Sequence, residues 1–232
     1  MVYLMIFYLN NPLQQVAVHD EVNHLISARV QPGEIIQITD LKGLVVRCVV
    51  EKIDKKTRRI EFNILEKKTF KKPIENILIQ AKTDKLYIEK LCEIAPIAGI
   101  TTIFLVETDF SLKNQQLRLE RLEHIMIRSC EQCHYPFLPH ISIINTHQKE
   151  TLLNEYQPVV LDGDGVKWQD IENDERINFS KKAFAIGPEG GWSEAEKKFF
   201  KEQKLPFISI GEHVLPAWLA GYTWSEIKNN SR

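Results

Sequence analysis

Residues 184–196, FAIGPEGGWSEAE, contain the pattern that decides the fold of the second half of the chain. Ala183–Ile186 is short, apolar and followed by a turn signal, which predicts a buried strand. Three glycines and a proline then fall within five residues, and Ser193 with Glu196 predicts a capped helix start. In an α/β sheet this junction lies at the carboxyl end of a strand, where ligands bind. Because glycines let a ligand approach bare backbone, we favour a ligand loop over a plain strand-to-helix turn.

The composition limits the class of protein. The chain has 232 residues, of which 44% are hydrophobic and 26% charged, as in an ordinary soluble globular protein. The net charge of −1 excludes a general polycation, so any nucleic-acid contact must come from a local patch. Met1–Leu9 is apolar but has no basic flank or cleavage site, and no apolar run is long enough to cross a bilayer. We therefore expect a cytoplasmic protein without a membrane partner.

The four cysteines offer one motif with a possible chemical role. Residues 130–134, CEQCH, match the C-x-x-C-H pattern of haem attachment, which belongs to exported proteins. A second C-x-x-C that could complete a zinc site is absent from the sequence. Cys130 and Cys133 also continue the apolar face of an expected helix. We therefore expect structural thiols in a reducing compartment and no metal site.

Residues 1–72 are expected to form a small β-barrel, because short strands and turns follow one another at regular spacing. The expected strands span residues 1–9, 35–39, 44–52 and 59–65, with a short helix over residues 20–28. This region also contains the concentrated positive charge of the chain. From Arg47 to Lys72, ten basic and four acidic residues give a local balance of 10 − 4 = +6. A basic hairpin can bind a phosphate backbone, or it can be a solvated edge that guards against aggregation; both interpretations remain open here.

Residues 71–73, KKP, predict a linker, after which strands and helices alternate over residues 73–232. Strands are expected over residues 77–81, 101–106, 140–144, 158–161, 183–186 and 206–210. Helices are expected over residues 84–98, 115–134, 149–156 and 193–203, and from about residue 217. This alternation predicts an α/β domain with a mostly parallel sheet covered by helices.

Three of the expected strands end in turns that contain glycine. These turns are Leu161–Gly163, Ile186–Gly191 and Ile210–Glu212. If the three strands are neighbours in the sheet, their loops converge on one cleft. The pattern is neither the dinucleotide-binding G-x-G-x-x-G nor the phosphate loop G-x-x-x-x-G-K-[ST], since no lysine follows the glycines.

The GPEGGWS loop of residues 187–193 resembles the signature loop of the bacterial 16S rRNA uracil-N3 methyltransferases, which are members of the SPOUT class. The resemblance extends along the whole chain. His24–Gly33, with Arg29 before a Pro-Gly-Glu turn, resembles the PUA-like RNA-binding barrel of that family. Glu131-Gln132 matches its Glu-Gln pair, and residues 210–215, IGEHVL, resemble its last cofactor loop.

The resemblance implies an N-terminal PUA-like β-barrel and a C-terminal SPOUT α/β domain with a deep trefoil knot, in a homodimer. It also implies S-adenosyl-L-methionine as the cofactor, bent within the knot and bound largely by backbone groups. The cofactor-binding residues that it implies are Leu161, Gly163, Ile186, Gly187, Gly190, Gly191, Ile210, Gly211, Val214 and Leu215.

The implied reaction methylates N3 of a uridine near the 3′ end of 16S rRNA (the m3U1498 type), with 16S rRNA or the small ribosomal subunit as partner. The N3 proton must leave, and the nitrogen must line up with the methyl group. Glu189 is the candidate catalytic residue, as a loop-orienting group or proton acceptor, and a structural role in the turn is the alternative. The implied RNA-binding residues are Arg29, Lys55, Lys56, Arg58 and Arg59.

Several positions depart from the family pattern. The family's last cofactor loop is usually followed by an arginine and then Thr-Glu-Thr-Ala, whereas residues 216–220 here are PAWLA. The first helix of the knotted domain usually has Lys-x-x-Glu, where this chain has Ile94 and Ile97. Such charges face RNA phosphate or a developing uridine anion. The alternative function is therefore a knotted RNA-binding protein with lost or altered methyltransferase activity, assisting ribosome assembly.

Overall fold

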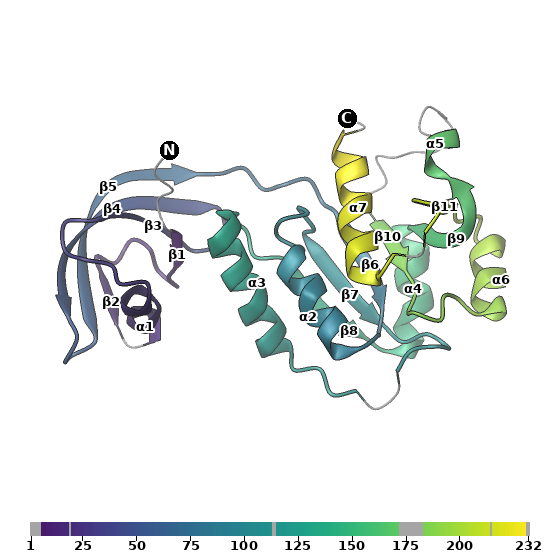
Figure 1. The fold of residues 1–232 in the computed structure, drawn as a ribbon, viewed down its shortest axis with the longest axis horizontal. Coiled ribbons are helices and arrows are strands. Elements are labelled where there is room, and N and C mark those ends of the chain that lie inside the picture. The colour runs from purple at the N-terminus through teal and green to yellow at the C-terminus, as the bar shows by residue number, and fades with distance from the viewer. Residues whose placement is uncertain (1–5, 19, 113–114, 172–182, 214, 231–232) are drawn as a thin grey trace. The chain divides into compact units, whose positions relative to one another are not determined.

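The computed structural model describes residues 6–18, 20–112, 115–171, 183–213 and 215–230 (Figure 1). The chain divides into two compact units. The first runs up to Pro73 and includes the later segment Ile127–Leu138, and the second comprises Ile74–Met126 and the residues from Pro139 onward. The second division falls inside helix α3, Leu119–Cys133, so this helix contributes to both units.

The first unit is a curled five-stranded sheet with one helix (Figure 1). Its elements are β1 (Ile6–Tyr8), β2 (Val16–Val18), α1 (Asp20–Ser27), β3 (Ile35–Thr39), β4 (Leu44–Asp54) and β5 (Arg59–Thr69). The strand order is β1-β3-β4-β5-β2, and β4 and β5 form a long antiparallel hairpin. Two register shifts between β4 and β5 mark bulges, which bend a sheet and increase its twist. The expected barrel is thus present as a curled sheet.

The segment Ile127–Leu138 belongs to the first unit because it satisfies backbone groups of that sheet. The Glu131 carboxylate accepts a hydrogen bond from the backbone N–H of Tyr8 at 2.8 Å. The N–H of Gly43 donates to the Pro136 carbonyl at 2.9 Å, in a turn where Gly43 has a φ of +107°. Because a side chain at Gly43 would collide with the Phe137 ring, glycine is required at this position for two reasons.

The second unit is built on a six-stranded parallel sheet. Its strands are β6 (Ile77–Ala81), β7 (Thr102–Val106), β8 (His140–Ile144), β9 (Val159–Lys167), β10 (Ala183–Ile186) and β11 (Phe207–Ser209). They lie in the order β11-β9-β10-β6-β7-β8, so β10 pairs with both β6 and β9 at the centre. The expected parallel α/β sheet is confirmed, whereas the trefoil knot stays a prediction.

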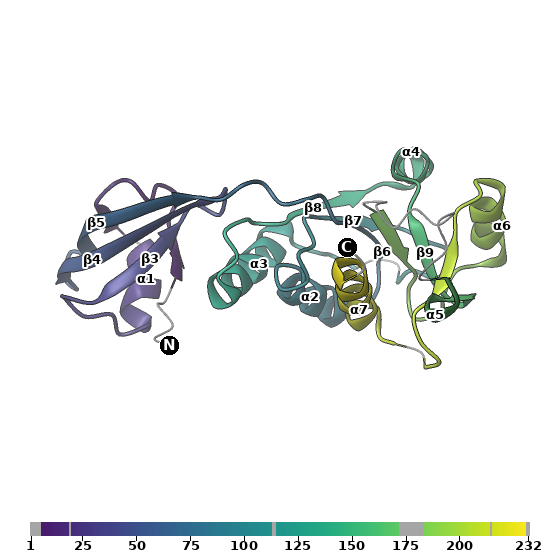
Figure 2. The same ribbon diagram turned by 90° about the horizontal axis from the view of Figure 1, so that it is seen from above.

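Helices cover both faces of this sheet (Figure 2). Helices α2 (Lys85–Ile94) and α7 (Ala217–Asn230) pack side by side on one face, where Gly221 of α7 leaves room for Leu91. Helices α4 (Thr146–Tyr156) and α6 (Glu194–Glu202) cover the opposite face. On that face, residues of the sheet and of the two helices form one apolar cluster, which includes Val160, Ala185, Leu152, Trp192 and Phe200.

Strand β9 is longer than the sequence indicates. The turn expected at residues 161–163 is wrong, because β9 continues through it to Lys167. The cause is Gly165, where a Cβ atom would lie 2.6 Å from the backbone of Ile208 in β11. The missing side chain therefore lets two strands approach each other closely, which is a use of glycine in strands that a turn signal does not distinguish. The short elements β2 and α5 (Trp168–Ile171) were also not expected.

The cysteines are all free thiols, as expected. Burial raises the pKa of both Cys48 and Cys92 to about 12, so neither forms a thiolate at neutral pH. Cys130 is buried as the helix pattern indicates, but Cys133 is exposed rather than part of an apolar face. The helix ends there, at Cys133, and His134 has a left-handed φ of +58°.

The helix start predicted at Ser193 is confirmed. The Ser193 hydroxyl accepts a hydrogen bond from the Glu196 backbone N–H at 3.2 Å, and the Glu196 carboxylate accepts one from the Ser193 N–H at 3.1 Å. This reciprocal pair is a capping box. The Ser193 hydroxyl also donates to the Asp109 carboxylate, which links the start of α6 to the loop after β7.

We expect Gly165→Ala to lower the free energy of unfolding by about 1–3 kcal/mol, because the methyl group would separate β9 from β11. Gly163→Ala is the matched control, since a Cβ atom at Gly163 would meet no atom within 4 Å. Denaturant unfolding of both variants measures the difference. Equal stability of the two variants would contradict the assigned close approach.

We expect Ser193→Ala to lower the free energy of unfolding by about 1–2 kcal/mol, because the helix loses its N-cap and the loop loses the bond to Asp109. Lys198→Ala, an exposed change in the same helix, should stay within about 0.5 kcal/mol of the unsubstituted protein. Thermal and denaturant unfolding measure both. A Ser193→Ala protein as stable as the Lys198→Ala control would show that the cap is not needed.

Candidate functional site

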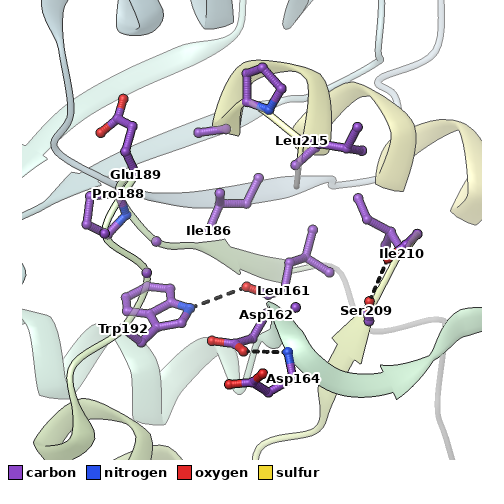
Figure 3. Close-up of a pocket in the computed structure, with 18 of the residues that line it drawn as sticks. Leu161, Asp162, Asp164, Ile186, Pro188, Glu189, Trp192, Ser209, Ile210 and Leu215 are labelled. Carbon is purple, nitrogen blue, oxygen red and sulfur yellow. Dashed lines mark hydrogen bonds between the residues drawn. The ribbon is translucent and has the colours of Figure 1, made fainter. Parts of the chain in front are cut away.

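A cavity of about 540 Å³ opens beside β9, β10 and β11 in the second unit (Figure 3). Its walls come from residues 161–164 within β9, the loop between β10 and α6, and the segment between β11 and α7. The three strands are parallel, and Leu161 pairs with Ile186, the last residue of β10, so these segments lie at the same end of the sheet. The structure therefore brings together the three glycine-bearing segments that the sequence singled out.

The residues implied as cofactor-binding line this one cavity wherever the structure describes them. They are Leu161, Gly163, Ile186, Gly187, Gly190, Gly191, Ile210, Gly211 and Leu215. The tenth, Val214, lies outside the described residues. Leu161 and Ile186 are buried, whereas Gly163, Gly190 and Gly211 are exposed. These nine residues thus contribute apolar side chains and glycine backbone to the cavity wall.

The central loop is a tight turn that requires its glycines. The Gly191 N–H donates to the Pro188 carbonyl at 2.9 Å, and Gly191 has a φ of +72°. A Cβ atom at Gly187 would lie 3.2 Å from the Gly191 carbonyl carbon and 3.3 Å from the Trp192 ring. Turn geometry alone therefore explains glycine at these two positions, while the exposed Gly190 leaves a wall of the cavity bare.

Trp192 links the central loop to the neighbouring strand, and the sequence analysis assigned it no role. Its side chain is 5% exposed, and its indole N–H donates to the Leu161 carbonyl at 3.3 Å (Figure 3). Its ring packs edge-on against Phe200 of α6, with 4.9 Å between the centroids. One side chain thus fixes the loop after β10, the end of β9 and the following helix relative to one another.

Glu189, the candidate catalytic residue, lies in the cavity wall and is exposed. Its carboxylate accepts a hydrogen bond from the hydroxyl of Thr83, a buried residue between β6 and α2. The carboxylate therefore has a fixed neighbour but also access to solvent and to the cavity. This geometry suits a group that accepts a proton or a hydrogen bond from a ligand.

An ion pair that was not anticipated forms another part of the wall. The Lys197 ammonium lies 3.3 Å from the Asp162 carboxylate and 2.9 Å from that of Asp164. The hydrogen bond from Lys197 holds the pKa of the Asp164 carboxyl below its ordinary value, and the same bond raises the pKa of Lys197. Asp162 also accepts the Asp164 N–H at 2.9 Å, so the two aspartates are fixed at the end of the apolar part of β9 (Figure 3).

The residues implied as RNA-binding lie in the first unit. Lys55 and Lys56 are in the turn between β4 and β5, where the Asp54 carboxylate accepts the Lys56 and Thr57 N–H groups. This turn and the segment Val30–Pro32 line a shallow groove of about 400 Å³. Arg29, Arg58 and Arg59 are exposed, and Arg59 pairs with Glu61 at 3.0 Å. The loop after α1 and the basic hairpin are therefore neighbours, as a shared binding surface requires.

In the ranges that the structure describes, no cluster of three or more His, Cys, Asp or Glu residues is arranged to hold a metal ion. Within the same described part of the chain, no helix combines the length and apolar character needed to cross a membrane.

The residues that the sequence analysis missed left weak signals. Trp192 is in the loop of residues 187–193, but no sequence pattern assigns a structural role to a tryptophan that follows glycines. Lys197 follows the helix cap by four residues and is one of several charged residues in the expected helix 193–203. Thr83 directly precedes the helix N-cap, Asp84, and no sequence pattern marks it. None of the three becomes notable until the sheet brings β6, β9 and β10 together.

We expect the ion pair of Lys197 with Asp164 to lose its contribution to the stability of the folded protein in acid. Because the pKa of Asp164 is lowered in the folded state, the pair stabilises the protein above the unfolded-state pKa of about 3.9 and less as the pH falls through the folded-state value. The stability difference between the unsubstituted protein and Lys197→Met should therefore be larger at pH 7 than at about pH 3. Urea unfolding at both pH values measures it, with Lys198→Met as the exposed control. A difference that does not depend on pH would contradict the ion pair.

Comparison with known proteins agrees with this architecture. A family model described as an RNA methyltransferase domain matches residues 70–223. Ribosomal RNA small subunit methyltransferase E from two Helicobacter pylori strains, ATCC 700392 / 26695 and J99 / ATCC 700824, is 33% and 34% identical over 126 residues. That match covers 53% of this chain and 53% of each relative, so the chain spans about half the length of the curated relatives it matches.

A solved structure extends the likeness in fold to both units. Ribosomal RNA small subunit methyltransferase E from Neisseria gonorrhoeae, bound to S-adenosyl methionine, has a TM-score of 0.82 and 24% identity. The superposition covers 98% of this chain and 98% of that one, which shows a shared fold. Because the family model spans well over half of its 232 residues, including every loop of the cavity, this chain belongs to the RNA methyltransferase family.

Proposed function

We propose that this protein transfers a methyl group from S-adenosyl-L-methionine to N3 of a uridine near the 3′ end of 16S rRNA. The supporting observation is that three glycine-bearing segments, in β9, after β10 and after β11, line one cavity. Family membership supports RNA methylation, and the Helicobacter pylori relatives are named as small-subunit ribosomal RNA enzymes. The structure from Neisseria gonorrhoeae holds S-adenosyl methionine on the same fold.

The residues present fit this cofactor. The cavity volume of about 540 Å³ is in the range of small-molecule sites. A Cβ atom at Gly163 or Gly211 would meet no protein atom within 4 Å, so space for a ligand adjoins both positions. The carboxylates of Asp162, Asp164 and Glu189 outnumber the single Lys197 cation in the wall, which favours a ligand with a positive sulfonium. Leu161 and Ile186 would contact its apolar parts.

The chain's own residues would contribute positioning and proton transfer. The cofactor supplies an electrophilic methyl group, so the protein must align N3 of the base and accept its proton. We assign proton acceptance to the Glu189 carboxylate, which Thr83 holds at the cavity wall. Trp192 and the Gly191 turn keep the central loop rigid during the reaction.

The first unit would bind the RNA backbone. We propose phosphate contacts from the exposed basic residues of the loop after α1 and of the β4–β5 hairpin, which are Arg29, Lys55, Lys56, Arg58 and Arg59. Phosphate contacts fix register and orientation, and the choice of base comes from the catalytic cavity. A homodimer and a trefoil knot complete the proposal, together with action on the small ribosomal subunit in the cytoplasm.

Two measurements test the proposed function. Calorimetry with S-adenosylmethionine should show binding to the purified protein, and Gly211→Val should weaken that binding at least about tenfold with an unchanged unfolding temperature. Mass spectrometry of 16S rRNA from a deletion strain should reveal one uridine that has lost an N3 methyl group. A fully methylated 16S rRNA in that strain would exclude this substrate. If the protein binds RNA but shows no binding of S-adenosylmethionine in calorimetry, the alternative of an RNA-binding protein without methyltransferase activity is favoured.

A further inference from the structure

The loop after β7, Thr108–Ser111, is fixed by its own hydrogen bonds. The Ser111 N–H donates to the Thr108 carbonyl at 3.1 Å, and the Thr108 N–H donates to the Ser111 hydroxyl at 3.0 Å. The two hydroxyl groups lie 2.9 Å apart and also share a hydrogen bond. Both residues are buried, so this loop has one defined conformation.

The same loop is attached to the start of α6, directly after the central loop of the cavity. The Asp109 N–H donates to the Glu196 carboxylate at 3.3 Å, and the Ser193 hydroxyl donates to the Asp109 carboxylate. Glu196 is itself buried and paired with Lys149 at 3.1 Å. The loop after β7 and the loop after β10 are therefore parts of one rigid assembly.

Phe110 lies between these hydrogen-bonded residues and is 53% exposed. Its position is nevertheless defined by Gly190 in the cavity wall: a Cβ atom at Gly190 would lie 3.3 Å from the Phe110 Cβ and 3.5 Å from its ring atoms. An aromatic ring thus lies against the bare backbone of the cavity rim. Single exposed apolar residues are common on protein surfaces, so what distinguishes Phe110 is its place beside the cavity wall rather than its exposure.

The proposed reaction requires an unpaired uracil base, which an aromatic ring can stabilise by stacking. N3 of uridine is on the Watson–Crick edge, so a paired uridine does not expose it. An enzyme that modifies this atom must take the base out of its pairing and stacking partners. Proteins compensate the lost stacking with aromatic side chains, which every base can contact through its π-face.

We propose that Phe110 is a stacking platform for the target uracil, holding the unpaired base beside the methyl-donor cavity. This inference rests on the proposed function and specifies how the RNA base is positioned. Phe110 lies next to Gly190 but does not itself line the cavity. We therefore assign it to the substrate base and not to the cofactor.

The test compares variants in methylation of small ribosomal subunits from the deletion strain with tritiated S-adenosylmethionine. Phe110→Ala should lower kcat/KM for the subunits by about 5- to 100-fold, the loss expected for one stacked base, with cofactor affinity unchanged in calorimetry. Phe110→Tyr should retain activity within about threefold, because a tyrosine ring stacks equally. Leu112→Ala, which alters an equally exposed aliphatic residue two positions away, is the matched control and should match the unsubstituted protein.

Different results would contradict the stacking role of Phe110 and the proposed function. Full activity of Phe110→Ala would overturn the stacking role. Equal losses of kcat/KM in Phe110→Ala and Leu112→Ala would also overturn the stacking role. So would a change in oligomeric state in light scattering, because it would place the Phe110 ring in a protein–protein interface. A protein that binds no S-adenosylmethionine and methylates no subunits before any substitution would refute the proposed function itself.

Discussion

The hydrogen bond from the Trp192 indole to the Leu161 carbonyl is the contact on which the cavity depends. Leu161 is already held by its pairing with Ile186, but the loop after β10 leaves the sheet at that point and needs a further contact to stay beside β9. The indole bridges them, and its packing against Phe200 connects both to helix α6. Because protein interiors are close-packed, this single buried ring sets the position of a loop that has few side chains to position it.

A site made of backbone needs rigidity from its surroundings. The cavity wall includes Gly163, Gly187, Gly190, Gly191 and Gly211, and glycine has the greatest conformational freedom of all residues. The fold removes that freedom through the Gly191 turn, the Ser193 cap and the ion pair of Lys197 with two aspartates. The proposed catalytic carboxylate and stacking ring are attached to the same frame, through Thr83 and Asp109.

Much of this fold could be predicted from local pattern. Strands β3, β6, β8 and β10 have the bounds expected from their apolar runs, and the capping box at Ser193 is present as predicted. The error over the extent of β9 shows what local pattern lacks. The residues Gly163 and Gly165 look alike in sequence, yet Gly163 has open space beside it and Gly165 lies against the backbone of Ile208. Their roles differ only through contacts with a strand more than forty residues away.

The sequence alone determined the alternation of strands and helices, the loop of residues 187–193 and the three glycine-bearing segments, because these depend on short-range periodicity and turn chemistry. The tertiary structure decided which of these segments meet. It placed β10 between β6 and β9, brought Asp162 and Asp164 to Lys197, and left Phe110 exposed against Gly190. Such contacts join residues far apart in the chain, so they follow from sheet order and packing, which no local pattern contains.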